Sequence, residues 1–333
     1  MSTLRQDPTT RQWVILAPKR ADRPHVPVWD ARPPLPEYDP SCPFCPDHED
    51  QTPPEVLRVP AEGDWTIRVV PNLYAALGAS GPADRAETGW FREAQGVGAH
   101  EVVIESRRHD ARLDEMTPDE VGGVLRVWRD RYRQLRARPG VRDAVLFKNF
   151  GRLAGTSLLH PHSQIVATPV LLPRLQRRLG VATRYFEDTG HCVYDDMVSA
   201  ERDAGVRIVH DEGPFVAFEP FASQDPFETM IVPTLTQSSF GQTDDELLPS
   251  LGRTLIKALG AIRGACSDPD FNLIVFSGPA NRETEEVFRW HVRILPKLST
   301  PAGFELGSGT SINTVPPEDA ALMLREALRT VAS

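Results

Sequence analysis

One arrangement of strands around a helix occurs twice in this 333-residue chain, and the repeat restricts the possible folds more than any other feature. Four pairs of landmarks recur in the same order, shifted by 127, 126, 127 and 129 residues: Glu101 and Glu228, Thr117 and Thr243, Leu146 and Leu273, and His162 and His291. Coincidence is a poor explanation for four ordered matches. We interpret them as an internal duplication of one strand–helix–strand–strand unit, rather than as two unrelated α+β halves.

The first copy of the unit carries the clearer local signals. The segment Thr117-Pro118-Asp119-Glu120 has the pattern of a capping box with proline at the first helical position, so it predicts the start of a helix. Apolar residues follow at helical spacing: Val121, Leu125, Trp128, Tyr132 and Leu135. Strands are expected at residues 65–70, 100–105, 144–147 and 160–166.

The second copy repeats this order less perfectly. The segment Thr243-Asp244-Asp245-Glu246 predicts a second capping box, although Pro249 falls in the first turn of the expected helix. Strands are expected at residues 227–232, 271–276 and 289–294.

The two copies differ in the last strand. The first copy contains His160-x-His162, whereas the second contains Arg289-x-His291. Alternate residues of a strand share one face, so His160 and His162 can point the same way. The second copy has therefore lost one of two histidines that the first copy keeps.

Composition excludes several classes of function. Apolar residues make up 40% of the chain and charged residues 25%, as in soluble globular proteins. The net charge of −9 argues against a nucleic-acid-binding surface, which is usually basic. No stretch of about 18 apolar residues predicts a membrane span, and residues 1–7 lack an apolar signal core. We therefore expect a cytoplasmic protein that binds neither nucleic acid nor a membrane.

A Cys42-x-x-Cys45 pair lies in a proline-rich segment, residues 24–54, that is expected to form a long irregular loop. In a reducing compartment such a close pair is typical of a metal or redox motif rather than a disulfide. A tetrahedral zinc site needs two further ligands, for which the candidates are His48, His109 and His160. Two buried cysteines without a metal, or a redox pair, are the alternatives.

The segment His160-Pro161-His162-Ser163-Gln164 is the most specific chemical signal in the chain. Histidine can attack phosphorus and leave again, because its ordinary pKa lies near neutrality. Such a reaction also needs donors for the phosphate oxygens. Gln164, Ser157 and the backbone of Gly155 and Thr156 are candidates for this role.

This segment resembles the His-Pro-His-Gly-Gln motif of the galactose-1-phosphate uridylyltransferase family, which belongs to the histidine-triad superfamily. The resemblance covers most of the chain. Other similar segments are Trp13 to Pro24, Cys42 to Cys45, Asn149-Phe150-Gly151 and Phe304 to Gly307. The resemblance implies an α+β fold built from a duplicated histidine-triad-like unit, mainly antiparallel sheet flanked by helices. Its halves would be residues 1–175, with the zinc knuckle and nucleophile, and residues 176–333, with a degenerate second metal site.

The resemblance also implies roles for individual residues. His162 would be the nucleophile that becomes nucleotidylated, and Gln164 and Ser157 would bind the transferred phosphate. Asn149 would line the same pocket as the Gly155-Thr156 loop. One structural zinc would be held by Cys42, Cys45, His109 and His160. Further substrate contacts would come from Arg20, Arg23 and Asn72, and the family works as a homodimer whose active sites share residues across the interface.

The chain departs from the family pattern at several positions. Ser163 replaces a glycine, a form that resembles the adenylyl-transferring, ADP-glucose phosphorylase-like branch. Leu73 and Tyr74 replace the Asp-Phe that follows Asn72 in uridylyltransferases. Other family residues that do not carry over are a second set of metal ligands, at Asp195, Thr236 and Arg289, and a hexose-binding Tyr-Glu pair near Ser308-Gly309. The base and the sugar therefore stay open.

The leading hypothesis is a nucleotidyltransferase. It would move a nucleoside monophosphate from a nucleoside diphosphate-sugar to a sugar 1-phosphate or inorganic phosphate, through a covalent bond to His162. The second hypothesis is a nucleotide-sugar or dinucleotide hydrolase of the same superfamily, in which water resolves the intermediate. The third is a non-catalytic, zinc-stabilised nucleotide-binding protein.

Overall fold

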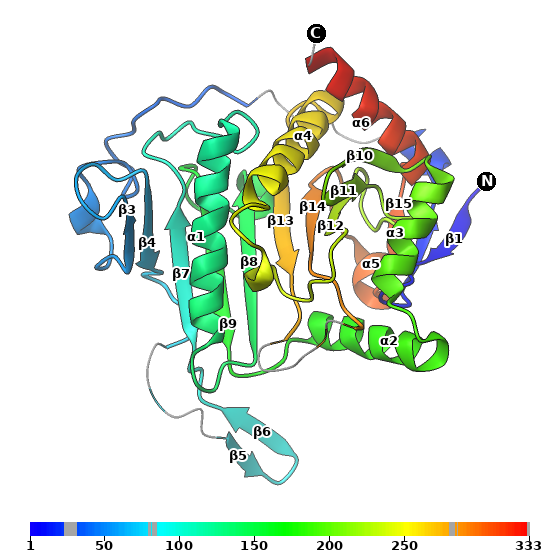
Figure 1. The fold of residues 1–333 in the computed structure, drawn as a ribbon, viewed down its shortest axis with the longest axis horizontal. Helices are drawn as coiled ribbons and strands as arrows, with labels where there is room; N and C mark the ends of the chain where they lie inside the picture. The colour runs from blue at the N-terminus through cyan, green and yellow to red at the C-terminus, as the bar shows by residue number, and fades with distance from the viewer. Residues whose placement is uncertain (23–31, 79–80, 82–84, 280–283, 285, 332–333) are drawn as a thin grey trace.

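A ten-stranded antiparallel sheet forms the centre of the protein (Figure 1). The computed structural model describes the chain except for residues 23–31, 79–80, 82–84, 280–283, 285 and 332–333. In the first half, from the sheet edge inward, the strands are β3 (Leu57–Val59), β4 (Ile67–Pro71), β7 (Ala99–Ile104), β9 (His162–Thr168) and β8 (Asp143–Phe150). In the second half they are β10 (Ile208–Glu212), β11 (Phe215–Phe218), β12 (Thr229–Pro233), β14 (His291–Pro296) and β13 (Phe271–Phe276).

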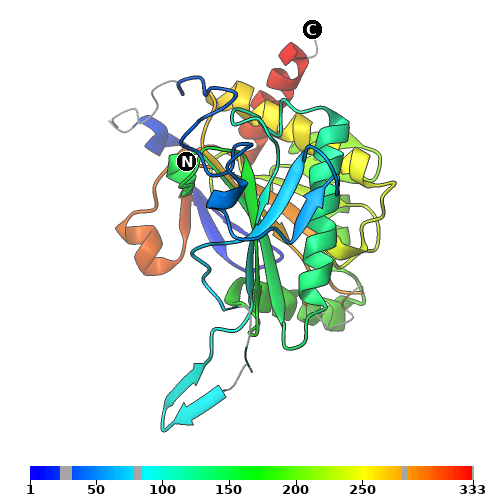
Figure 2. The ribbon, with the colours of Figure 1, turned by 90° about the vertical axis from the view of Figure 1, so that its left-hand side faces the viewer.

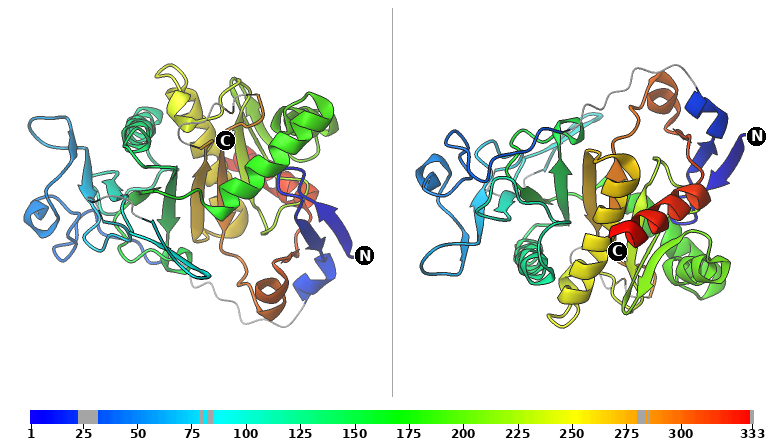
Figure 3. Two further views of the ribbon diagram at one scale, coloured as in Figure 1. Left: turned by 90° about the horizontal axis from the view of Figure 1, so that it is seen from below. Right: turned by 90° about the horizontal axis from the view of Figure 1, so that it is seen from above.

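The two halves meet where β8 pairs with β13, and Asn149 lies opposite Asn272 at this junction. Outward from the junction, both halves place their strands in the same connectivity order, as the views from above and below allow the reader to follow (Figure 3). The expected α+β fold with a duplicated unit is therefore confirmed. One continuous sheet joins the copies.

Strand register supports two of the four landmark pairs. Leu146 pairs with Ile165 in the first half, and Leu273 pairs with Ile294 in the second. The shift of 127 residues between β8 and β13, and of 129 residues between β9 and β14, therefore agrees with how these strands pair.

The match between Glu101 and Glu228 is wrong by one residue. Glu101 lies opposite Ile165, but the residue opposite Ile294 is Thr229. Because a step of one residue turns a strand side chain to the other face, Glu228 is not the counterpart of Glu101.

Two long helices, α1 (Pro118–Arg136) and α4 (Leu248–Cys266), pack side by side on one face of the sheet, in front of it in Figure 1. The predicted capping box of α1 is present, since Thr117 accepts from the Glu120 amide and Glu120 accepts from the Thr117 amide. Their apolar faces and the sheet residues between them form the main core.

The predicted capping box at Thr243 is wrong. Helix α4 begins at Leu248 with Leu247, not Thr243, at the N-cap position, because Pro249 is accommodated only in the first helical turn. Thr243 instead ends the short 3-10 helix η4 (Phe240–Gln242), and its carbonyl accepts from Arg129 of α1.

The opposite face of the second half is covered by α2 (Pro173–Thr189) and α3 (Val193–Ala204), which link the two halves. Strand β11 shows the division. Phe215 and Ala217 belong to the core under α1 and α4, whereas Val216 and Phe218 pack with residues of α2 and α3. The second half is therefore buried on both faces.

The remaining elements lie around this centre. A small sheet of β1 (Thr3–Gln6), β2 (Trp13–Leu16) and β15 (Ser311–Asn313) packs beside the second half, and the hairpin of β5 (Arg85–Thr88) and β6 (Phe91–Ala94) projects from the body (Figure 2). The other short elements are η1 (Pro18–Asp22), η2 (Glu49–Gln51), η3 (Arg152–Ala154), α5 (Gly303–Ser308) and α6 (Pro317–Val331). Among the described residues, no helix has the length and apolar content needed to cross a membrane.

The two threonines give a matched test of the caps. Thr117→Val removes a side-chain acceptor from the start of α1, so we expect the free energy of unfolding to fall by about 1 kcal/mol. Thr243→Val makes the same chemical change, but its buried Oγ1 has no hydrogen-bond partner among the described residues. Its effect should stay within about 0.5 kcal/mol. Urea unfolding measures both, and equal losses would contradict this account.

Candidate active site

Four buried side chains, Cys42, Cys45, His109 and His160, converge beneath the first-half strands, with all their ligating atoms within 4.8 Å of one another. The Cys45 Sγ lies 3.6 Å from Nδ1 of His109 and 3.6 Å from Nδ1 of His160. Bonds of about 2.3 Å to sulfur and 2.1 Å to nitrogen around a tetrahedral ion give edges of about this length. The cluster therefore has the ligand types and the spacing to hold a metal ion.

Neighbouring groups orient this cluster. The His160 Nε2 donates to the Ser106 carbonyl over 2.8 Å, which leaves Nδ1 for a metal. Burial raises the pKa of the Cys42 thiol to about 11, so a cation is needed to keep its thiolate form there. His48, the alternative ligand, lies outside the cluster because its nitrogens contact the Cys42 carbonyl and the Tyr38 hydroxyl.

His162 starts strand β9 on the same face of the sheet. Its Nδ1 lies 2.8 Å from the His160 carbonyl and donates to it, so the ring is fixed and Nε2 is left for the cavity that His162 lines. Burial, together with the charge of Lys148 and against the opposing effect of this hydrogen bond, lowers the pKa of His162 to about 4. The imidazole is therefore neutral at pH 7.

The cavity has a volume of about 270 Å³. Its wall includes Lys148, Asn149, Thr156, His160 and His162 from the first half, and Asp268 from the second. The second half also positions Asn149, since Asn272 Nδ2 donates to Asn149 Oδ1 over 2.9 Å and to the Ala154 carbonyl over 2.8 Å. Both copies of the unit thus build one site.

Gln164 lies two residues beyond His162 and contacts Asn72 and His100. The His100 Nδ1 accepts from the Ala76 amide, so its Nε2 donates to Gln164 Oε1 over 2.7 Å. Asn72 Nδ2 donates to the same oxygen over 3.3 Å. The Gln164 Nε2 group takes no part in these bonds and faces the same side of the strand as His162.

Only some of the other predicted site residues lie on the cavity. Thr156 lines the cavity, with its hydroxyl bonded to the Leu158 carbonyl, and Gly155 adopts the left-handed conformation before it. Ser157 is exposed and is not among the cavity-lining residues. Arg20 is exposed in η1, also outside this lining. Arg23 lies outside the described residues.

Three basic residues near His162 were not predicted from the sequence. Lys148 is buried and donates to Glu105 over 2.6 Å and to the His162 carbonyl over 3.2 Å. Arg32 and Arg112 line the cavity and contact Asp268. Lys148 directly precedes Asn149, in a strand whose sequence predicts burial. A lysine in such a strand is unusual and could have indicated a functional residue. The two arginines carry no such signal.

The counterpart of the metal cluster in the second half contains an ion pair. Arg289 occupies the position equivalent to His160, and its Nε and Nη2 lie 2.9 and 2.6 Å from the two oxygens of Asp195. A guanidinium cannot act as a metal ligand. His291 keeps the arrangement of His162, because its Nδ1 lies 3.0 Å from the Arg289 carbonyl.

Comparison with known proteins identifies the family. Residues 1–171 match the family model described as galactose-1-phosphate uridyl transferase, N-terminal domain. The chain is 36% identical to ADP-glucose phosphorylase of Arabidopsis thaliana, over 97% of this chain and 92% of that protein. It is 30% identical to galactose-1-phosphate uridylyltransferase of Thermotoga maritima, over 98% of each.

Solved structures point to the same family. A crystal structure of an ADP-glucose phosphorylase from Arabidopsis thaliana with bound ADP-glucose superposes with a TM-score of 0.84 at 34% identity, covering 98% of this chain and 99% of that one. A uridylyltransferase structure gives 0.78 at 25% identity over the full length of both. The chain belongs to the galactose-1-phosphate uridylyltransferase family. The predicted class of enzyme, a nucleotidyltransferase or an ADP-sugar phosphorylase, is thereby confirmed.

Two glycines give a matched test of the cavity loop. Gly151 and Gly140 have φ angles of +84° and +83°, so alanine is strained at both, by about 1–2 kcal/mol. A Cβ at Gly151 would also lie 2.0 Å from Asp270 Oδ1, whereas one at Gly140 meets nothing within 4 Å. Asp270 holds the loop by accepting from the Leu153 amide over 2.6 Å.

We therefore expect Gly151→Ala to lower the free energy of unfolding by at least about 1 kcal/mol more than Gly140→Ala, and to reduce activity as well. Urea unfolding and turnover of both variants are the measurements. Similar values for the two would show that Asp270 moves aside without cost.

Proposed function

We propose that this protein transfers a nucleoside monophosphate from a nucleoside diphosphate-sugar to a phosphate acceptor, with His162 as the nucleophile. One observation carries the proposal: the hydrogen bond from His162 Nδ1 to the His160 carbonyl presents a neutral, oriented Nε2 at the cavity. A ring held in this tautomer is prepared for attack on phosphorus.

In the first step, Nε2 of His162 forms a bond to the α-phosphorus, and the bond from that phosphorus to the sugar 1-phosphate breaks. The Nδ1 proton stays on the ring, where the His160 carbonyl stabilises the charge that develops. In the second step, an acceptor phosphate oxygen attacks the same phosphorus, and the P–N bond breaks. With inorganic phosphate as acceptor, the products are a nucleoside diphosphate and the sugar 1-phosphate.

Neighbouring side chains have distinct proposed roles. Gln164 donates its Nε2 group to a phosphate oxygen, since Asn72 and His100 already hold its Oε1. Asn149, fixed by Asn272, lines the phosphate pocket together with Thr156, and Gly155 precedes Thr156 in the same loop. Ser157 would reach the phosphate from the same loop. Asn72 also belongs at the nucleoside end of the site.

An adenine nucleotide is the donor that we propose. The relative at 36% identity is an ADP-glucose phosphorylase, and its solved structure contains ADP-glucose. Ser163 belongs to the motif form of that branch, although it is fully buried and not part of the cavity lining. We therefore propose ADP-glucose as donor and inorganic phosphate as acceptor.

The covalent step is tested by mass spectrometry after brief exposure to ADP-glucose without acceptor. We expect an acid-labile adduct of one AMP per chain that maps to His162. His162→Asn should form no adduct and lose several orders of magnitude in rate, as removal of a catalytic nucleophile does elsewhere.

The matched control is His291, which has the same carbonyl hydrogen bond but lies under α2 and α3. His291→Asn should still form the adduct on His162. An active enzyme that never carries the adduct, or a His162→Asn variant with substantial activity, would overturn the mechanism. The same experiment with UDP-glucose in place of ADP-glucose measures which base the enzyme prefers.

We also propose that the metal of the Cys42, Cys45, His109 and His160 cluster is zinc. Two thiolates and two imidazoles in a closed tetrahedral set suit zinc, which would supply structural cohesion rather than a reactive position. His160 would then connect the metal to the nucleophile, since its backbone carbonyl orients His162.

Metal analysis of purified protein should give one zinc per chain, since Arg289 paired with Asp195 cannot be a ligand in the second half. His160→Asn should lose the zinc and destabilise the protein. His48→Asn, the matched control, should keep it because His48 is outside the cluster. Two zinc ions per chain, or none, would contradict the proposal.

A homodimer is the assembly we propose, because Arg20 is exposed on η1 rather than on the cavity of its own chain. In a dimer it can serve the neighbour's site. Light scattering at micromolar concentration should give twice the 37.0 kDa mass of the chain. A fully active monomer would exclude this arrangement.

A further inference from the structure

The hairpin of β5 and β6, here called the arm, projects from the body of the protein (Figure 2). Every residue from Ala86 to Gln95 is exposed. Trp90 and Phe91, at the tip, are 98% and 79% exposed. A two-stranded hairpin is at best marginally stable alone in water, and exposed aromatic side chains at such a place mark an interaction site. The arm therefore needs a surface to pack against, and its own chain supplies none.

Strand pairing shows what the arm presents to a partner. Thr88 pairs with Phe91, and Ala86 pairs with Glu93. Paired residues and residues two apart share one face, so Phe91 and Glu93 point the same way. The other two residues of this face are small. The face thus offers an aromatic ring and a carboxylate next to the Trp90 indole, which is a surface that arginine side chains recognise.

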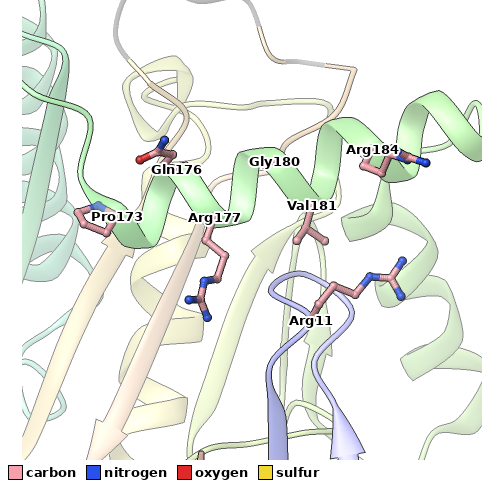
Figure 4. Close-up of a pocket in the computed structure, with 7 residues that line it drawn as sticks. All are labelled: Arg11, Pro173, Gln176, Arg177, Gly180, Val181 and Arg184. Carbon is pink, nitrogen blue, oxygen red and sulfur yellow. The ribbon is translucent and has the colours of Figure 1, made fainter. Parts of the chain in front are cut away.

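A shallow groove with three arginines lies on the second half, between α2 and the β1–β2 turn (Figure 4). Its volume is about 500 Å³, and its described lining contains no acidic residue. The residues that line it are Arg11 of the turn and, from α2, Pro173, Gln176, Arg177, Gly180, Val181 and Arg184. The groove combines apolar surface with positive charge, in a chain whose net charge is −9.

The guanidinium groups of this groove are available to a partner. Arg11 and Arg177 are exposed, and their side chains make no hydrogen bond or ion pair with another described residue. Arg184 is paired only with Asp188, over 3.2 Å. Arg11 also has a φ angle of +58°, which is uncommon for a residue other than glycine. An arginine held in that conformation is a candidate for a functional side chain.

The arm and the groove lie at the same end of the main sheet (Figure 1). The arm is inserted between β4 and β7, and α2 follows β9. Ala99, the first residue of β7, pairs with Ala167 near the end of β9. A twofold rotation exchanges equivalent surfaces, so the arm of each chain can enter the groove of the other.

The surface available to this contact is sufficient for a stable dimer. An aromatic side chain buries about 150–250 Å². Two arms carry four such side chains, so the arms bury about 600–1,000 Å² and the grooves a similar area. The total of about 1,200–2,000 Å² is that of a specific protein–protein interface.

We propose that the arm docks into the α2 groove of a second copy of this chain, with Trp90 and Phe91 packed against Arg11 and Arg177. The contact occurs twice, once on each side of a twofold axis. It rests on the homodimer proposed above and names the surfaces that form it.

The base of the arm is joined to the active site. The arm lies in sequence between Asn72 and His100, both of which hold Gln164. The Ala76 amide, near the arm's first strand, donates to His100 Nδ1 over 3.2 Å. A docked arm thus restrains the segment that orients Gln164, so the second chain supports the site of the first.

Sedimentation equilibrium tests the contact through the dimer dissociation constant. Trp90→Ala should raise this constant at least about thirtyfold, because large aromatic side chains act as interface anchors. Arg177→Glu should raise it at least about tenfold, since it removes a partner of the rings and repels Glu93. The matched controls are Leu322→Ala on α6 and Arg253→Glu on α4, both exposed and outside the contact, and neither should change the constant.

Cross-linking tests the same contact by position. Thr88→Cys places a thiol on the arm, and Gly180→Cys places one in the groove, where a Cβ meets nothing within 4 Å. The two variants, purified separately, mixed and oxidised, should form a disulfide between chains. Thr88→Cys mixed with Arg253→Cys should form none.

The outcomes separate this contact from the homodimer itself. A monomeric wild-type protein would reject both. A dimer that Trp90→Ala leaves intact, or that gives no cross-link between Thr88→Cys and Gly180→Cys, would reject the docking of the arm and leave the homodimer in place.

Discussion

The pairing of β8 with β13 is the interaction on which the rest of the structure depends. It joins two copies of one unit into a single ten-stranded sheet, so neither copy keeps an unpaired edge at the junction. It also places Asn272 of the second half where it holds Asn149 and the Ala154 carbonyl of the first. The loop that forms the cavity is therefore fixed from both copies, and the site exists only because the copies are joined.

The two copies differ in the elements that cover one face of the sheet. Helices α2 and α3 fold over the second half and bury His291 completely, while the corresponding face of the first half keeps a cavity at His162. Both histidines have the same carbonyl hydrogen bond. The proposed reactivity of His162, and not of His291, thus follows from access, since an oriented imidazole without room for a phosphate cannot react.

The cysteine and histidine cluster links the irregular N-terminal segment to the sheet. Cys42 and Cys45 come from a loop with little regular structure, whereas His160 lies two residues before strand β9, which begins at the proposed nucleophile His162. A bound ion would replace the apolar packing that such a loop lacks. In the second half, Arg289 and Asp195 form a direct ion pair at the equivalent position, so the charge balance is internal to the chain.

The sequence by itself determined the duplication and the helix that follows Thr117, because repeats and capping patterns can be read along the chain. It left His48, His109 and His160 as candidate partners of Cys42 and Cys45, and the family resemblance implied the set that the structure brings together. The start of α4 and the one-residue difference between Glu228 and Thr229 required the strand pairing, which depends on contacts far apart in the chain. Tertiary structure alone placed Lys148 beneath His162, His100 on Gln164, and Arg32 and Arg112 at the cavity. Each of these contacts joins elements whose separation in sequence carries no signal of their proximity, so only the folded sheet brings them together.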